Sequence, residues 1–505
     1  MDATARQLIL TPTEMVEVDS AAISSGIAGY GLMITAGSAV SACVLENYPQ
    51  AKGALVLCGP GNNGGDGYVA ARFLQESGMP VRLYSLIDPA GLKGDAARAR
   101  DDWHGPILDL TTLECADDHV VIDALFGAGL DRNIEGVGAA AIEAVVSSGL
   151  PVVTADLPSG ISGRTGQTAG VALRAEHTVT FAALKPGHLL MPGADHCGDV
   201  HLIDIGIPSR VIDNHCERLW LNGPSLWAPE LPAPSPSGHK YKRGHLGIFS
   251  GPFSQTGAAR LAAQSALHAG AGLVTVLSPS SAVAANAGHL TAIMLRKIDD
   301  LTALDELLAD KRYTGFVLGP GYGVGDKVRR FAERIAVSGR ALVLDADGIS
   351  AFGEQPQELF AHFAGSKPRL VLTPHDGEFS RLFPDLHDDT QLSKVDRARM
   401  AAERSNAVVL YKGADTVIAS PDGRAVINNN APPWLATAGS GDCLAGIIGA
   451  LLVQGMPPFE AAAAAAYMHG TAGRRAGEGL TADDLPENIP TPGELTGLHS
   501  VHTGN

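Results

Sequence analysis

The amino-acid sequence predicts an α/β protein of two domains, each a three-layer sandwich with a mostly parallel sheet between helices. Three observations predict this class. The chain has 505 residues, more than one ordinary hydrophobic core holds. Short apolar strands alternate with amphipathic helical patterns along most of the chain. A proline-rich stretch near the middle interrupts the alternation and separates two halves.

The composition excludes several classes of protein. Hydrophobic residues make up 45% of the chain and charged residues 18%, which favours large cores over disorder. The formal net charge of -17 argues against a surface for nucleic acid or for an anionic membrane. Backbone N–H groups or a bound cation can still hold the phosphates of a small ligand. We find no signal peptide and no apolar run of about 18 residues, so we expect no membrane partner.

The cysteines indicate a reducing compartment. The six of them, at positions 43, 58, 115, 197, 216 and 443, are scattered and form no CxxC pair. This spacing favours reduced thiols over a disulfide framework or a zinc site. We therefore expect a cytoplasmic protein.

The first half follows the βαβ rhythm of an open parallel sheet. Helices are predicted over residues 68–78, where Val69, Ala70, Phe73 and Leu74 share one face, and over 138–148. Strands are predicted over residues 53–58, 81–87, 119–127, 151–158 and 177–184. We place the first domain at residues 1–222.

The stretch from 221 to 238 contains five prolines and shows neither a helical nor a strand period. It predicts a linker over 223–238 and a second domain over 239–505. In this second half, helices are predicted over 257–272, 440–455 and 458–473, and a β-hairpin over 416–428. Strands are predicted over 245–251, 273–279, 315–321, 341–348, 369–375 and 407–413.

The stretch CGPGNNGGDG (58–67) is the first candidate site. It follows a buried strand and opens a helix, and ligands of open α/β sheets bind at the carboxyl ends of strands. Glycines let backbone N–H groups approach an anion, and Asn62, Asn63 and Asp66 add oxygens suited to a cation or to sugar hydroxyls. The alternative is a tight turn between strand and helix. The loop matches neither GxGxxG nor GxxxxGK[ST].

Two aspartates at other strand ends converge on the same edge of the predicted sheet. Asp123 precedes a Gly-rich loop, and Asp156 precedes Pro158-Ser159-Gly160. Either aspartate alone would also suit a turn cap. Together with the Asn-rich loop, their oxygens suit a hard cation.

ATAGSGDCLAG (436–446) is the strongest chemical signal. A Gly-rich turn opens an apolar helix, and the amides of Ala438, Gly439, Ser440 and Gly441 can form an anion hole for a transferring phosphoryl group. Asp442 is placed to take a proton from a substrate hydroxyl. The alternative is an Asp that favours a helix N-terminus for its dipole, which does not explain the turn before it.

Other polar residues follow strands of the second half. His375 precedes Asp376 and Glu378, where Glu378 is either a helix N-terminal acid or an outer group for Mg²⁺. Asp345 and Asp347 lie at a strand end, and the alternating pattern turns them to the same side.

The first half resembles a known family. GPGNNGGDGYVAAR, VIDALFGAGL, ADLPSGISGRTG and the opening segment 11–37 are similar to NAD(P)H-hydrate epimerase domains, the YjeF N-terminal family, over about residues 10–215. The resemblance implies a Rossmann-like fold and a potassium ion near the substrate diphosphate, held by Asn63, Asp123 and Ser159. It implies substrate contacts from Asn62, Asn63, Gly64, Gly65, Asp66, Gly127, Ala128, Gly129, Leu130, Asp131, Arg132, Asn133 and Asp156.

The second half resembles the ribokinase-like superfamily and, within it, the ADP/ATP-dependent NAD(P)H-hydrate dehydratases. Besides the AGSGD turn, segments 239–276, LGPGYG, LDADGI, LTPHDGEFSRL and LYKGADTVIASPDG resemble that family in the same order, over about 239–475. The resemblance implies nucleotide binding by Lys412, Gly413, Ala414, Asp415 and Thr416, together with Ala438, Gly439, Ser440 and Gly441. It implies that Ala258, Gly321, Gly323, His375 and Asp442 face the hydrated nicotinamide nucleotide.

Together the resemblances imply a bifunctional repair enzyme for hydrated NADH and NADPH. The first domain would interconvert the R and S hydrates with Asp156 handling protons. The second would dehydrate the S hydrate with ADP or ATP and Mg²⁺, with Asp442 as the base. We expect small-molecule partners, a homo-oligomer and no nucleic acid. Two alternatives stay open: a ribokinase-like small-molecule kinase of the hydroxymethylpyrimidine type with an accessory domain, and a non-enzymatic ligand-binding first domain.

Overall fold

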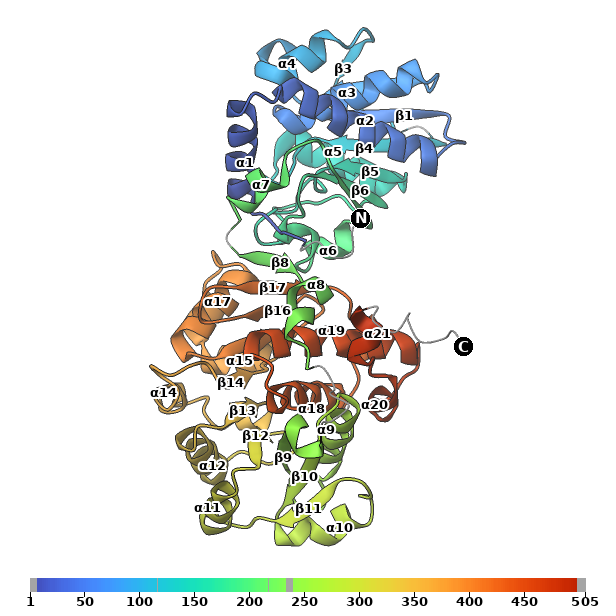
Figure 1. Cartoon of the computed structure of the whole chain (residues 1–505). Helices are drawn as coiled ribbons and strands as arrows, with labels where there is room; N and C mark the ends of the chain where they lie inside the picture. Colours follow the sequence, from blue (N-terminus) through green and yellow to red (C-terminus); the bar gives the residue numbers. More distant parts are fainter. Residues whose placement is uncertain (1–6, 116, 217, 233–238, 497–505) are drawn as a thin grey trace, which may run out of the picture. The chain divides into compact units, whose positions relative to one another are not determined.

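The computed structural model describes residues 7–115, 117–216, 218–232 and 239–496, which fall into two compact units (Figure 1). One unit spans Gln7–Leu219, and the other begins at Trp220. The division lies close to the predicted domain limit at residue 222. The limits of the two functional domains stay a prediction.

The first unit is built on a seven-stranded sheet with strand order β3-β2-β1-β4-β5-β6-β7. All neighbouring strands are parallel, so the polar strand ends share one edge. Every residue of β1 and β5 is buried, as expected when helices cover both faces. The strands are β1 (Gly53–Cys58), β2 (Val81–Ser85), β3 (Ile107–Asp109), β4 (His119–Ala124), β5 (Val152–Ala155), β6 (His177–Phe181) and β7 (Asp199–Ile203).

Helices cover both faces of this sheet, which makes the predicted three layers. Val40 and Val69, from α2 and α3, pack on one face with Val56 of β1. Ile142 of α5 packs on the other face with Leu55. The helices are α1 (Pro12–Ser24), α2 (Gly29–Asn47), α3 (Asn62–Glu76), α4 (Gly94–Asp101), α5 (Gly136–Ser148), α6 (Gly193–His196) and α7 (Ser209–Asp213).

The length and composition of α2 would also suit a membrane span. In this fold, however, one face of the helix is buried, and its residues Met33, Val40 and Val44 belong to the core under the sheet. The core helix of a soluble protein can have the same length and the same apolar composition. The expectation of no membrane partner stays a prediction.

The second unit is built on a ten-stranded sheet with strand order β11-β10-β9-β12-β13-β14-β15-β16-β17-β8. It is parallel from β11 to β15, and β16 and β17 form the predicted antiparallel hairpin. The strands are β8 (Leu219–Leu221), β9 (His245–Phe249), β10 (Leu273–Ser278), β11 (Met294–Lys297), β12 (Tyr313–Leu318), β13 (Ala341–Leu344), β14 (Leu370–Leu372), β15 (Val408–Tyr411), β16 (Thr416–Ala419) and β17 (Ala425–Asn428).

The helices of the second unit again form two layers. Ala259 of α9, Ile447 of α18 and Ala462 of α19 pack on one face of the sheet. On the other face, Phe331 of α12 packs against Phe249, with their ring centres 5.5 Å apart. The longer helices are α9 (Gly257–His268), α11 (Leu301–Ala309), α12 (Asp326–Val337), α14 (Pro356–Ala361), α15 (Asp376–Leu382), α17 (Lys394–Ser405), α18 (Ser440–Val453) and α19 (Pro458–Ala476). The short ones are α8 (Pro224–Trp227), α10 (Val283–Ala287), α13 (Asp347–Ser350), α16 (Pro384–Asp388), α20 (Leu485–Asn488) and α21 (Pro492–Thr496).

The described part of the proline-rich stretch is folded. Pro224–Trp227 forms α8, a helix with proline in its first turn, and the Trp227 side chain is fully buried in the core of the second unit. The indole N–H of Trp227 donates a hydrogen bond to Asn222 at 3.2 Å. The end of the predicted linker, residues 233–238, lies outside the described residues.

Candidate active sites

A cavity of about 520 Å³ lies in the first unit beside the carboxyl ends of β1, β4 and β5. Apolar side chains of α1 and of the first half of α2, such as Met15 and Leu32, form part of its wall. The predicted substrate residues in the wall are Asn62, Asn63, Asp66, Gly127, Ala128, Gly129, Leu130, Asp131, Arg132 and Asp156. Gly64, Gly65 and Asn133, which were predicted with them, do not line it.

Close packing explains two glycines of the CGPGNNGGDG loop. A β-carbon on Gly59 would lie 1.7 Å from the carbonyl oxygen of Leu125. One on Gly64 would lie 2.1 Å from the carbonyl oxygen of Gly59. The loop therefore folds tightly on itself and on the end of β4, and α3 begins at Asn62, beside the cavity. Both readings of the loop hold at once, since the tight turn is also a cavity wall.

The three residues predicted to hold potassium lie in unequal surroundings. Asp123 is fully buried and accepts hydrogen bonds from the Ser159 hydroxyl at 2.6 Å and the Ser159 N–H at 2.7 Å. The side-chain amide of Asn63 is buried and both its nitrogen and its oxygen have no hydrogen-bond partner. A β-carbon on Gly127 would lie 3.2 Å from the Asn63 amide, so this side chain reaches the loop after β4. Among the three predicted potassium ligands, Asn63 is therefore the one whose side-chain oxygen is still available to bind an ion.

Asp156 lies at the centre of a buried polar cluster. Its carboxylate pairs with the Lys185 ammonium at 2.7 Å and accepts from the Thr180 hydroxyl at 3.0 Å and the Ala128 N–H at 2.9 Å. Its φ of +65° is in the left-handed region, which turns the chain sharply after β5. The His188 ring contacts the Asp156 carbonyl oxygen at 2.7 Å.

The protonation states in this cluster follow from burial and charge. Burial opposes ionisation of Asp156, but the charge of Lys185 and the hydrogen bonds from Lys185 and the Ala128 N–H together outweigh it and lower the pKa of Asp156 to about 2. Burial and the same lysine lower the pKa of His188 to about 4, so the ring is neutral. Its Nδ1 accepts the Lys185 N–H at 2.9 Å, so its Nε2 is the atom that donates to Asp156. The cluster holds one stable ion pair at neutral pH.

Two further carboxyl groups face the same cavity in a different state. Burial raises the pKa of Asp66 well above its usual range, and the charges of Asp156 and Asp19 raise it further, against Lys185. Burial also raises the pKa of Asp19. Both groups line the cavity. The site thus combines an ionised aspartate with carboxyl groups that retain protons more readily.

In the second unit, Asp442 lies in the first turn of α18, as the AGSGD turn predicts. Gly439 precedes the helix with φ +88°, and a β-carbon there would lie 2.8 Å from Leu261 and 2.9 Å from Ala482. Burial, followed by the charge of Asp345, raises the pKa of Asp442 to about 7, and Lys412 opposes the shift. Asp442 is therefore half-protonated near neutral pH.

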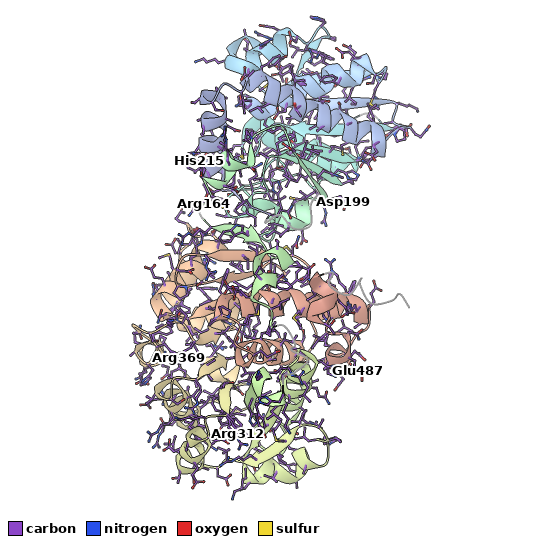
Figure 2. The ribbon with its side chains drawn as sticks, in the orientation of Figure 1. Arg164, Asp199, His215, Arg312, Arg369 and Glu487 are labelled. Carbon is purple, nitrogen blue, oxygen red and sulfur yellow. The ribbon has the colours of Figure 1, made fainter. Side chains whose placement is uncertain are left out.

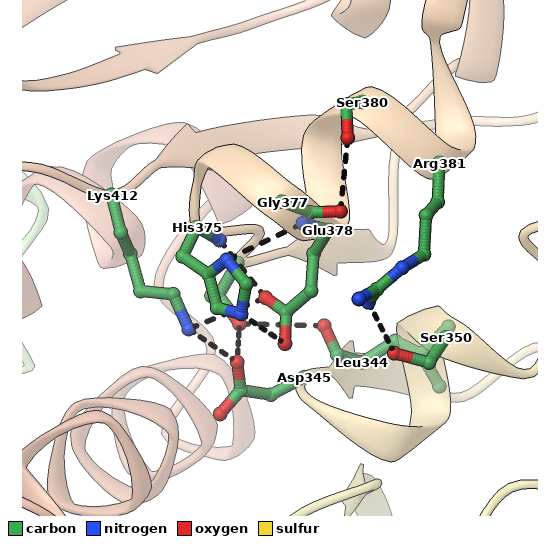
Figure 3. Close-up of polar contacts among 10 residues, drawn as sticks. Leu344, Asp345, Ser350, His375, Gly377, Glu378, Ser380, Arg381 and Lys412 are labelled. Carbon is green, nitrogen blue, oxygen red and sulfur yellow. Dashed lines mark hydrogen bonds and ion pairs between the residues drawn. The ribbon is translucent and has the colours of Figure 1, made fainter.

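Lys412 connects the carboxylates of this site (Figure 3). Its ammonium lies 2.8 Å from Asp345 and 3.7 Å from Glu378. Asp345 also accepts from the Thr373 hydroxyl at 2.8 Å. A β-carbon on Gly441 would lie 3.7 Å from the same ammonium, so Lys412 reaches the first turn of α18.

Asp345 and Asp347 have different partners, although the strand pattern predicted the same side for both. Asp345 is 2% exposed and pairs with Lys412, whereas Asp347 accepts the Gly323 N–H at 2.9 Å. The reason is that β13 ends at Leu344 and Ala346 adopts a φ of +47°, which breaks the alternation.

His375 caps α15, and Figure 3 shows it beside Glu378. Its Nδ1 accepts the Glu378 N–H at 3.3 Å, and the Glu378 carboxylate accepts the His375 N–H at 2.9 Å. The His375 side chain is 56% exposed, so its ring is available to a ligand. The Glu378 carboxylate thus both caps α15 and lies close to the Lys412 ammonium.

The remaining predicted residues of this half lie on loops beside these groups. Gly413 and Ala414 are exposed, and the Thr416 hydroxyl donates to the Gly413 carbonyl oxygen at 2.7 Å. The Asp415 carboxylate pairs with Lys394 at 2.5 Å. Elsewhere, Gly321, with φ +62°, packs on Gln255 in the loop before α9 and on Ala258 in the first turn of that helix.

Comparison with known proteins gives a consistent result for both halves. Residues 29–187 match the family described as YjeF-related protein N-terminus, and residues 246–491 match NAD(P)H-hydrate dehydratase. The chain is 34% identical over 486 residues to the bifunctional NAD(P)H-hydrate repair enzyme Nnr of Thermofilum pendens, covering 91% of each chain. It is 36% identical over 517 residues to that of Moorella thermoacetica, covering 95% of this chain and 96% of the relative.

The chain belongs to the family of bifunctional NAD(P)H-hydrate repair enzymes. The relative in Escherichia coli is 34% identical, with 91% of this chain and 88% of the relative covered. Among solved structures, an ADP/ATP-dependent NAD(P)H-hydrate dehydratase of Bacillus subtilis, co-crystallised with ATP/Mg²⁺, aligns with a TM-score of 0.46 and 23% identity. It covers 54% of this chain and 96% of its own.

Membership of the repair-enzyme family confirms the predicted function over the small-molecule kinase and over the non-enzymatic module. Several polar residues of the two sites did not emerge from the sequence. Lys185, His188 and Asp19 were missed in the first unit, and His469, whose ring contacts the Ser440 hydroxyl at 3.0 Å, was missed in the second. A signal existed for Lys185 and His188, because KPGH directly follows a predicted strand.

Proposed function

We propose that the chain repairs hydrated NADH and NADPH in two steps, epimerising the R and S hydrates in the first unit and dehydrating the S hydrate in the second. The observation that carries the proposal is the presence of two separate polar centres, around Asp156 and around Asp442. Each lies inside the segment that matches one half of the repair-enzyme family.

In the second unit, Asp442 acts as the base. A carboxylate with a pKa of about 7 is a stronger base than an exposed aspartate and is still half ionised at neutral pH. It takes the proton of the ring hydroxyl while the hydroxyl oxygen attacks the terminal phosphorus of the nucleotide. The bond from that phosphorus to the remaining nucleotide breaks, which gives AMP from ADP, or ADP from ATP. The ring then carries a phosphate ester, a better leaving group than hydroxide.

Elimination completes the repair. The carbon–oxygen bond of the ester breaks, inorganic phosphate leaves with the bonding pair, and a neighbouring ring carbon loses a proton to the departing phosphate. The ring double bond of NAD(P)H is restored. Lys412 neutralises charge beside Asp442, and the amides of Gly439 to Gly441 face the transferring group.

The nucleotide would lie along Lys412 to Thr416 and the turn before α18. The exposed Gly413 and Ala414 leave room for an adenine nucleotide. Asp345 and Glu378 supply carboxylate oxygens, the donors that suit Mg²⁺. When bound, Mg²⁺ neutralises charge on the phosphates of the donor. The hydrated substrate would face Ala258, Gly321 and His375.

In the first unit, the hydroxyl leaves the ring and water returns on the other face. Asp66, whose raised pKa makes it a better proton donor than an exposed aspartate, donates a proton to the departing hydroxyl, so that the carbon–oxygen bond breaks and water forms. The ring nitrogen pushes its lone pair into the ring and becomes positively charged. Asp156 was expected to handle protons, but Lys185 holds its carboxylate ionised, so in this proposal it stabilises the positive charge instead. Re-addition of water to either face returns the proton to Asp66.

Potassium fits the first site. Asn63 offers a buried amide oxygen without a partner, and Asp123 and Ser159 add oxygens beside the loop after β4. A bound K⁺ would neutralise a substrate phosphate next to this loop. The fit can be tested by thermal stability in KCl against NaCl and in the Asn63→Ala variant, which should lose the difference.

The proposal is tested with purified R and S hydrates. With either ADP or ATP, the protein should restore the near-ultraviolet absorbance of the reduced nicotinamide from both epimers. Asp442→Asn should abolish this recovery but leave epimer exchange, followed by chromatography, intact. Absence of recovery from the S hydrate with both nucleotides would contradict the dehydratase role. Recovery from the S hydrate without exchange would contradict the epimerase role.

We also infer a cytoplasmic homo-oligomer. Cys43, Cys58, Cys115, Cys197 and Cys443 are free thiols, which suits a reducing compartment. Light scattering of the purified chain should give a mass above the 52.1 kDa of one chain, and a mass equal to it would contradict the oligomer.

A further inference from the structure

Three side chains of the kind that bind transition metals meet in the first unit, away from the catalytic cavity. They are Cys43, His177 and His201, and one donor atom from each lies within 4.8 Å of the others. Nδ1 of His177 lies 3.1 Å from Nε2 of His201. The three residues come from α2, β6 and β7.

The topology of the sheet explains why they meet. In the parallel pair of β6 and β7, His177 is opposite Asp199 and Val179 is opposite His201, so the two histidines share one face two positions apart. Asp199, labelled in Figure 2, is the first residue of β7. Helix α2 covers this face, and its residues Val40 and Val44 pack there with Val179. Cys43 lies on the same helix and is 8% exposed.

The surroundings are those of a formed site rather than a chance contact at the surface. The ring of Tyr48 packs edge-on against His177, with ring centres 5.9 Å apart. The Asn47 side-chain amide lies 3.6 Å from Cys43 Sγ and donates to the Cys43 carbonyl oxygen at 2.9 Å. Such outer hydrogen bonds orient metal ligands and tune them.

We propose that Cys43, His177 and His201 bind a divalent transition metal of the zinc class, with water in the fourth position. One thiolate and two imidazoles suit Zn²⁺ and exclude Mg²⁺ and Ca²⁺, which take oxygen ligands. Zinc–nitrogen bonds of about 2.0–2.1 Å at a tetrahedral angle put two nitrogens about 3.3 Å apart, close to the distance between the histidine rings. The metal replaces the thiol proton and the hydrogen bond between the rings.

The site would act through α2. Gly29, Leu32, Met33 and Ala36, in the first half of this helix, line the substrate cavity, whereas Cys43 lies in its second half. The metal would therefore link α2, which lines the cavity, to β6 and β7. The carboxyl ends of these two strands lie nearer Lys185. Because the ions bind the folded unit, they raise its stability by mass action. We expect a metal-dependent rise in the melting temperature of the first unit.

The test uses the full chain, stripped with a chelator and titrated with Co²⁺ and then Zn²⁺. We expect one Co²⁺ per chain, with the near-ultraviolet absorption of a thiolate-to-cobalt transition and the visible bands of a tetrahedral ion, both removed by Zn²⁺. Cys43→Ser should abolish the thiolate absorption. It should weaken Zn²⁺ binding more than about 100-fold, since the loss of an outer-shell partner alone costs about 10–100-fold.

Matched controls separate the site from unspecific binding. Cys115→Ser and His119→Gln, which alter residues of the same unit outside the cluster, should leave the affinity and the spectrum unchanged. His201→Gln should weaken binding as Cys43→Ser does. Circular dichroism of each stripped variant establishes that it is folded. Substoichiometric Co²⁺, an absent thiolate band, or an affinity for Zn²⁺ that Cys43→Ser leaves unchanged would overturn the proposal.

Discussion

At the scale of single residues, Asp442 shows how two effects compete at a helix start. The N-terminus of α18 favours a negative charge there, usually by less than about 1 kcal/mol at exposed sites. Burial and the nearby Asp345 act the other way and prevail, so the pKa of Asp442 rises to about 7. Asp442 is therefore suited to accept a proton, but its burial lowers the stability of the folded protein when it is ionised.

This conflict predicts a stabilising substitution. The folded protein holds the Asp442 proton more tightly than the unfolded chain does, where an aspartate has a pKa of about 3.9. Stability therefore falls as pH rises from about 4 to about 7 and stays reduced above that range. Asp442→Asn should raise the free energy of unfolding at pH 8 by about 1–3 kcal/mol and change it little at pH 4. Urea denaturation at both pH values measures this.

A control and an activity profile complete that prediction. Asp305→Asn, on the exposed part of α11, should change stability by less than about 0.5 kcal/mol at either pH. The rate of dehydration by the unaltered chain should fall below pH 7, because the protonated carboxyl group is no base. A rate that stays constant from pH 8 to pH 5 would contradict the role of Asp442.

Asp156 permits a test that separates folding from catalysis. Asp156→Asn keeps a side chain that tolerates the left-handed backbone, but it leaves Lys185 buried without an opposite charge. We expect a loss of about 3–5 kcal/mol in stability and no epimer exchange. Adding Lys185→Met should restore much of the stability, because the buried charge is gone, without restoring exchange. Thermal melts and chromatography of the two epimers measure both outcomes, and exchange by the double variant would contradict the proposed roles.

The residues that sequence reasoning found and missed differ in a physical way. The residues that were found lie near glycines at strand ends or helix starts, where the local sequence pattern indicates a site. They are Asn63, Asp123, Asp156 and Asp442. Asp19 and His469 lie within helices α1 and α19, and only tertiary packing brings them to a site. The same holds for Cys43, His177 and His201, which come from three distant segments, so cysteine spacing could not reveal them. The residue roles carried over from the resemblance stay predictions.

At the scale of elements, the loop between β1 and α3 predicts a sharp contrast between neighbouring glycines. A β-carbon on Gly64 would press on the carbonyl oxygen of Gly59 at 2.1 Å, whereas one on Gly61 would meet nothing within 4 Å. Gly61 has an extended backbone that other residues also adopt. Gly64→Ala should therefore cost about 1–3 kcal/mol, and Gly61→Ala less than about 0.5 kcal/mol. Calorimetry of the two variants checks this, and equal melting temperatures would contradict it.

The strands that were predicted correctly are the buried ones. β1, β9, β12 and β15 are apolar runs covered on both faces, and such runs are recognisable from composition alone. The strands β3, β7, β8 and β11 were not predicted. They lie at the sheet edges and are short or partly exposed, and β3, β7 and β11 carry polar residues, so no periodic apolar signal marks them. Helix α8 was not predicted either, because it is short and lies in a proline-rich stretch without a helical period.

At the scale of the whole molecule, β8 predicts where the chain tolerates division. A truncated chain that begins at His239 lacks β8, α8 and the buried Trp227, which pack in the second unit. Loss of a buried Trp alone costs about 3–5 kcal/mol. We expect this fragment to be insoluble or to melt far below a fragment that begins at Leu219. Expression of both fragments, with calorimetry of the soluble material, measures the difference, and equal stability would contradict the structural role of β8.

The position of β8 also bears on modularity. Asn222 directly follows β8. Its backbone N–H donates to the Ile427 carbonyl oxygen at 2.8 Å and its side-chain amide to the Ala463 carbonyl oxygen at 2.7 Å, so this segment is part of the folded second unit. β8 covers the outer edge of β17, and an uncovered edge strand invites pairing with other chains. A gene that encoded the dehydratase half alone would have to keep this strand or supply another cover for that edge. The segment that joins the two activities is thereby also a safeguard against aggregation.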